Sequence, residues 1–178
     1  MENVSEAKSG IEQAAEDLFN FAVDREDVKV LMANLHKAAD IQRNSVEYEL
    51  QILKIISVGW AISFYLENRP EKDRLAACYW RAIEAFSKNL SETSGLIVGH
   101  PIDYFQILKE RLATYVNSLQ QKPEAPEPAV VIGPEFALAC GNRNDVFTVM
   151  TGSRMFIAAI GSVKQYLEAL GLKQAGVQ

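Results

Sequence analysis

Residues 50–66 read LQILKIISVGWAISFYL, a run interrupted only by Gln51, Lys54, Ser57, Gly59 and Ser63. No proline breaks the run, and a helix over it would be apolar almost all the way round. Such a helix cannot lie on a water-facing surface. It must form the buried centre of a helical bundle, lie against a partner, or enter a membrane. The run therefore predicts how the chain is built, and it leaves the function open.

Membrane insertion is the alternative that these residues disfavour. The run is the sequence's one transmembrane candidate, but it is short for a bilayer, which needs ~20 apolar residues. Lys54 near its middle would add a cost of ~3 kcal/mol. The first ten residues, MENVSEAKSG, are polar and acidic and lack the basic and apolar regions of a secretory signal. We therefore expect a cytoplasmic protein with no membrane partner.

The totals indicate one domain of ordinary composition. A chain of 178 residues fits a single domain, which we place at residues 1–172, followed by a frayed tail at 173–178. The net charge of −5 and the absence of a Lys/Arg run argue against a nucleic-acid partner. Cys78 and Cys140 are too few for a zinc site or a disulfide framework. We interpret them as small buried side chains in a reducing compartment, with a redox pair as the alternative.

Apolar residues at steps of three and four predict a chain made of helices. The long second segment has no proline, so it predicts either one helix of ~60 Å or a helix interrupted near residues 43–45 or 57–59. Asparagine, serine and glycine are poor helix interiors, which is why we place the interruptions there. The predicted helices cover residues 5–23, 25–67, 70–90, 101–121, 134–140 and 144–170.

Two segments are predicted to connect helices. Residues 122–134 contain four prolines and should form an extended, proline-rich crossover. Residues 91–99 contain two glycines, and we expect Leu96, Ile97 and Val98 there to plug one end of the bundle. The fold class that follows is an all-α, single-domain bundle of five to six helices, with one long central helix and a proline-rich crossover.

The first candidate site is a polar stripe on the long segment. His36, Asp40, Arg43 and Glu47 step by four, three and four residues, which places them on one helical face. A histidine with two carboxylates could bind a divalent metal or supply acid–base chemistry. The alternative, which we favour, is a solvated row of ion pairs worth ~0.3–0.5 kcal/mol each. The chain has no Glu-x-x-His sequence and its other histidine, His100, is distant, so we expect no cofactor and no stoichiometric metal.

The second candidate site is aromatic. Trp60, Phe64, Tyr79 and Phe86 lie on two consecutive predicted helices and could line a pocket for an apolar ligand. Aromatic residues at helical spacing can equally be core, because each buries a large area. We expect Trp60 and Phe64 to be nearly free of solvent in the assembled protein, together with Leu53 and Ile56.

Three functional hypotheses remain open, and an enzyme is the least favoured because no nucleophile–base set is supported. The first is a non-enzymatic interaction or assembly module. We expect a homodimer, because the long helix exceeds what the ~30 Å helix at 101–121 can cover; an unidentified protein partner is the other possibility. The second hypothesis is a small protein that binds an apolar ligand. The third is a metal-dependent enzyme that uses the His36 stripe.

Overall fold

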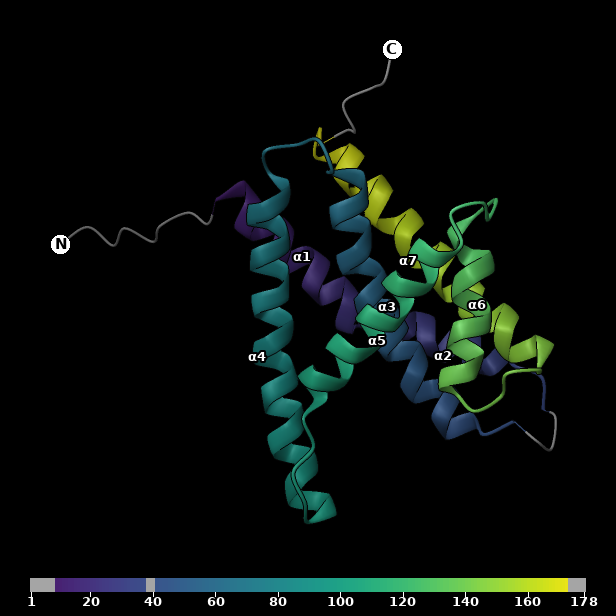
Figure 1. Ribbon diagram of the computed structural model, residues 1–178. Helices are drawn as coiled ribbons and strands as arrows, with labels where there is room; N and C mark the ends of the chain where they lie inside the picture. The colour runs from purple at the N-terminus through teal and green to yellow at the C-terminus, as the bar shows by residue number, and fades with distance from the viewer. Residues whose placement is uncertain (1–8, 38–40, 173–178) are drawn as a thin grey trace.

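The computed structural model describes residues 9–37 and 41–172, and within them it contains seven helices and no strand (Figure 1). The prediction of an all-α bundle is therefore confirmed. The tail predicted at 173–178 and the expected helical start at residue 5 lie outside the described residues. The helices are α1 (Gly10–Val23), α2 (Glu26–Asn34), α3 (Arg43–Tyr65), α4 (Lys72–Val98), α5 (Tyr104–Gln121), α6 (Pro128–Ala139) and α7 (Val146–Ala169).

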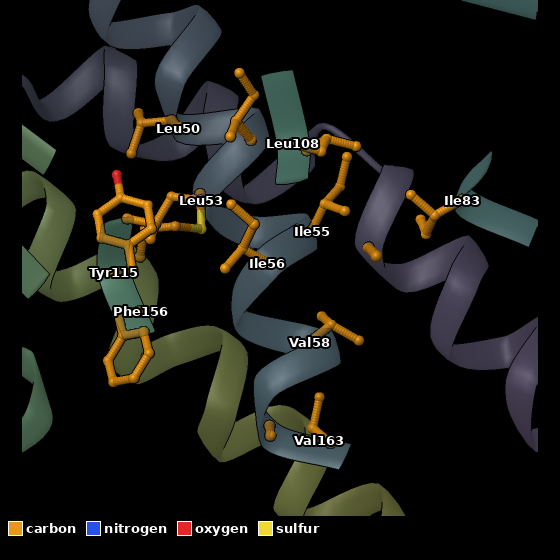
Figure 2. Close-up of a cluster of buried hydrophobic side chains, with 14 of the residues drawn as sticks. Leu50, Leu53, Ile55, Ile56, Val58, Ile83, Leu108, Tyr115, Phe156 and Val163 are labelled. Atoms are coloured by element: carbon orange, nitrogen blue, oxygen red, sulfur yellow. The ribbon is translucent and has the colours of Figure 1, made fainter. Parts of the chain in front are cut away.

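Helix α3 is the centre of the molecule and carries most of the apolar run that predicted it. It contacts each of the other six helices, and every residue from 52 to 59 is buried. Figure 2 shows side chains of α3, among them Leu53 and Ile56, packed with Tyr115 of α5 and Phe156 of α7. Helices α1, α4 and α7 of the same chain cover α3, so its burial does not require a second copy.

Of the alternatives predicted for residues 25–67, the interrupted helix is the one that occurs, and its break lies just before the position predicted at 43–45. Helix α2 ends at Asn34 and α3 begins at Arg43. The Arg43 guanidinium donates to the carbonyl oxygens of Met32, at 2.7 Å, and Leu35, at 3.4 Å. A cation that satisfies the last carbonyls stabilises a helix end. Arg43 therefore stabilises the end of α2 at the break between the two helices. The alternative break at 57–59 does not occur.

Gly59 has a packing reason to be in a central helix. A Cβ added at this position would lie 2.2 Å from Cζ2 of Trp80. The glycine therefore lets the indole of α4 lie directly on the backbone of α3.

Lys54 is fully buried, which would be costly for an unpaired charge. Its Nζ lies 2.9 Å from Oδ2 of Asp27 and 2.9 Å from the carbonyl oxygen of Asp24. It also lies 4.4 Å from the ring centroid of Phe21. This lysine therefore holds the end of α1 and the start of α2 against the central helix.

The expected connector at 91–99 is helical, because α4 continues to Val98 and ends at Gly99 with a φ of 78°. The exposed fractions of Leu96, Ile97 and Val98 are 88%, 81% and 53%. These residues do not plug the bundle. They lie on the end of α4, which reaches beyond the other helices in Figure 1.

The proline-rich crossover is shorter than predicted, because α6 begins at Pro128 and includes Pro134. A proline fits the first turn of a helix, where its missing N–H has no intrahelical partner. Inside a helix a proline frees the carbonyl four residues earlier, here that of Val130, whose side chain is exposed. Val131, Ile132 and Phe136 are buried, and their burial offsets the cost of Pro134. The non-helical connector is residues 122–127.

Among the described helices, the one that could cross a membrane by its length and composition is α7, and not the run at residues 50–66 that the sequence indicated. Helix α7 has a mean hydropathy of 1.5. Helix α7 packs along α6 and α3.

Candidate functional site

A cavity of about 300 Å³ lies between the end of α1, the first half of α3, the second half of α4 and the start of α5. This volume is at the lower end of the range for small-molecule sites. Most of the wall is apolar, with a small number of polar side chains among the apolar ones. The lining residues are Val23, Arg25, Glu47, Tyr48, Gln51, Phe86, Leu90, Ser91, Ser94, Ile102 and Tyr104.

The start of α5 is held in place beside the cavity by two hydrogen bonds. Asp103 caps the helix by accepting from the backbone N–H of Gln106 at 2.9 Å. Ser91 of α4 accepts from the backbone N–H of Tyr104 at 3.0 Å. These contacts fix Tyr104 against Tyr48 in an edge-to-face pair, with ring centroids 6.2 Å apart.

Burial raises the pKa of the Tyr104 hydroxyl. The phenol therefore stays protonated at neutral pH and gives the wall a neutral group.

The charged groups of the wall neutralise each other. Arg25, which precedes α2, forms an ion pair with Glu47 of α3, and both side chains are about half exposed. Exposed pairs of this kind contribute little to stability. Because one positive and one negative group cancel, the wall offers no net charge to a ligand.

Gln51 is a residue of the cavity lining whose side chain has one unsatisfied polar atom, Oε1. Its Nε2 donates to the carbonyl oxygen of Ala22 at 2.9 Å, which fixes which end of the amide is nitrogen. Its Oε1 is buried and has no hydrogen-bond partner within the described part of the chain. Buried acceptors are nearly always satisfied in native structures, so an orphaned oxygen on a residue that lines the cavity indicates a place for a donor.

The His36 stripe does not form one face of a helix. His36 follows the end of α2 and stacks on Phe147 of α7, with ring centroids 4.4 Å apart. Glu47 lies on α3 and pairs with Arg25, while Asp40 lies outside the described residues. Residues 9–37 and 41–172 contain no group of three His, Cys, Asp or Glu side chains placed to hold a metal.

The four aromatic candidates are not gathered in one pocket. Phe86 lines the cavity, but Trp60 stacks on Phe64 in the second half of α3, with ring centroids 4.7 Å apart. In the single chain Leu53 and Ile56 are buried, whereas Trp60 is partly buried and Phe64 is 44% exposed. The burial of Trp60 and Phe64 in the assembled protein stays a prediction. Tyr79 is a core residue whose hydroxyl donates to the carbonyl oxygen of Ile55 at 2.7 Å.

A second polar cluster joins α3 to α5 without a cavity. Glu49 is buried and accepts from Nε and Nη2 of Arg111 at 2.9 and 2.7 Å. Burial is the main cause that raises the pKa of the nearby Cys140 thiol to about 12. A thiol with such a pKa is protonated at neutral pH and is a poor nucleophile. This cluster orders the core, and it offers no chemistry of its own.

Sequence reasoning missed Tyr48, Gln51 and Tyr104, which the cavity brings together from two helices. Gln51 gave a signal, because it is a polar interruption at the start of an otherwise apolar run. Tyr104 gave none, because its place depends on how α5 begins beside α4.

No known protein family, no curated protein and no solved structure matches this chain.

Proposed function

We propose that this protein is a non-enzymatic binder of a small, mainly apolar ligand, and that the ligand occupies the cavity between α1, α3, α4 and α5. The observation that carries the proposal is a largely apolar cavity of about 300 Å³ whose lining includes Gln51, a residue with an orphaned Oε1. Apolar pockets with a few fixed polar groups are typical of small-molecule sites. A ligand that binds the folded chain there would also stabilise the fold.

The test is a titration of the labelled protein with naphthalene, followed by amide chemical shifts. Naphthalene has no hydrogen-bonding group and fits the volume, so it tests the cavity alone. We expect shifts at Gln51, Phe86 and Tyr104, with a dissociation constant below about 1 mM.

Two variants decide whether the shifts come from this cavity. Leu90→Trp fills it and should abolish binding. Leu119→Trp adds the same bulk to a separate hollow beside the 122–127 connector and should leave binding unchanged. Absence of binding to the wild-type protein, or equal binding by both variants, contradicts the proposal.

A second candidate function is assembly, as the sequence suggested. The observation in its favour is the exposed apolar end of α4, formed by Leu96, Ile97 and Val98. Contiguous exposed apolar residues mark interaction surfaces in soluble proteins. On this hypothesis the chain forms a homodimer whose interface includes the end of α4.

Light scattering across a wide range of concentration tests the homodimer. The expected result is twice the 19.8 kDa mass of the chain, reduced to the monomer mass in a variant that carries Ile97→Asp. A mass of 19.8 kDa for the wild-type protein at every concentration removes this candidate.

A further inference from the structure

Resting on the proposed function, we infer that the ligand is an uncharged, mainly apolar molecule that carries one N–H donor, and that this donor binds Oε1 of Gln51. Three features of the cavity restrict the chemical class of the ligand: its charge, its apolar wall and the unmatched acceptor of Gln51.

The charge of the wall disfavours an ionised ligand. Arg25 and Glu47 are each other's partners, so an anion would have to displace Glu47 and a cation would have to displace Arg25. Val23, Phe86, Leu90 and Ile102 supply apolar surface around them. An ionised group of the ligand would have to lose its hydration in order to contact this apolar surface. That loss is unfavourable without a free counter-charge.

The hydrogen-bonding capacity of the wall is unbalanced. Ser91 already accepts from the backbone of Tyr104, and the amide nitrogen of Gln51 already donates to Ala22. The oxygen of the same amide is left without a donor among the residues described. This oxygen has no exposed surface, so the ligand's donor reaches it when the amide turns about its soft terminal torsion, at the expense of part of the bond to Ala22.

A site built around a buried acceptor should discriminate strongly between two ligands that differ only in the donor. A ligand without the donor leaves the acceptor unpaired, and such a loss is expensive in a desolvated site. The discrimination should therefore exceed what a difference of one methyl group in an apolar wall would cause.

The experiment compares indole with 1-methylindole, in which a methyl group replaces the N–H hydrogen. We expect indole to bind the wild-type protein about tenfold more tightly or better. Indole should also move the side-chain Cδ resonance of Gln51, and 1-methylindole should not. Gln51→Met removes the acceptor and keeps the length of the side chain, so the ratio of the two affinities should fall to about one. Gln120→Met, the same change at a residue that lines the separate hollow beside the 122–127 connector, should keep the ratio.

Using a ratio within each variant cancels any general loss of stability. If the wild-type protein binds both indoles equally, the inference fails while the proposed function survives. If Gln51→Met still prefers indole, the acceptor is a different group, and the inference about Oε1 of Gln51 is also overturned. If neither indole nor naphthalene binds, the proposed function itself fails. Should Gln51→Met not fold, the wild-type ratio and the Cδ resonance still decide the matter.

Discussion

At the scale of single residues, the ion pair with Asp27 explains how the charged side chain of Lys54 can lie in the most buried helix. Asp27 is partly exposed and can regain water when its partner is lost, whereas Lys54 cannot. We predict that Asp27→Asn lowers the free energy of unfolding by about 3 kcal/mol, because it leaves a buried charge without its counter-ion.

Lys54→Met is the companion change, and it should cost less than about 1.5 kcal/mol because it removes the buried charge altogether. Urea unfolding of both variants measures the difference. A larger loss for Lys54→Met than for Asp27→Asn would mean that the hydrogen bond to Asp24 outweighs the ion pair.

Gly59 gives a second prediction at this scale. Alanine is favoured over glycine in a helix by about 1 kcal/mol, but a Cβ here would overlap the Trp80 indole. Overpacking costs ~1–3 kcal/mol, so Gly59→Ala should be destabilising overall. The matched control is Gly161→Ala in α7, where a Cβ meets nothing within 4 Å, and this change should stabilise. Thermal unfolding of the two variants should therefore shift in opposite directions.

At the scale of elements, one side-chain hydrogen bond joins the first helix to the last. The hydroxyl of Tyr166 in α7 donates to Asp17 of α1 at 2.6 Å. Chiefly through this bond, and also through one from Gln13, the pKa of Asp17 is lowered from its ordinary value of 3.8. A carboxyl with a lowered folded-state pKa stabilises the fold above its unfolded pKa, and this contribution is lost as the pH falls through the folded pKa.

The prediction is that Tyr166→Phe raises the pKa of Asp17 toward 3.8, as measured by a carboxyl ¹³C titration. Wild type and variant should differ more in stability at pH 7 than at a pH low enough to protonate the carboxyl in both. Gln13→Ala, which removes the smaller contribution, should raise this pKa less. An unchanged Asp17 pKa in Tyr166→Phe would contradict the hydrogen bond.

Periodicity predicted most helices and failed where distant contacts decide the boundaries. The spans of α5 and α7 follow from regular apolar spacing, although α5 begins at Tyr104 after its cap Asp103 and not at residue 101. The break before α3 depends on Arg43 reaching back to α2, and the start of α6 depends on burial that outweighs Pro134. Local propensity indicated a possible break near residues 43–45 but could not choose between it, a break at 57–59 and a continuous helix, and it gave no sign that α6 begins at Pro128. The cavity escaped prediction for the same reason, because Gln51 and Tyr104 become neighbours only in the tertiary fold.

At the scale of the whole molecule, one helix links all the others, so the bundle should unfold as one unit. The α6–α7 pair packs on one side of α3 and the α1–α4 pair on another. Neither pair can separate without exposing the apolar surface of α3. A shared core of this kind is what makes a small domain unfold in a single cooperative transition.

The two tryptophans report on these two sides. Trp60 contacts Phe156 of α7, whereas Trp80 of α4 lies on Gly59. We predict that Trp80→Phe, which leaves Trp60 as the reporter, and Trp60→Phe, which leaves Trp80, each show a fluorescence transition in urea that coincides with their own loss of far-UV circular dichroism. If the Trp60 signal changes at lower urea than the circular dichroism while the Trp80 signal does not, the α6–α7 pair detaches first. The chain would then consist of two stability units held on a common helix, and the description of one domain would have to be given up.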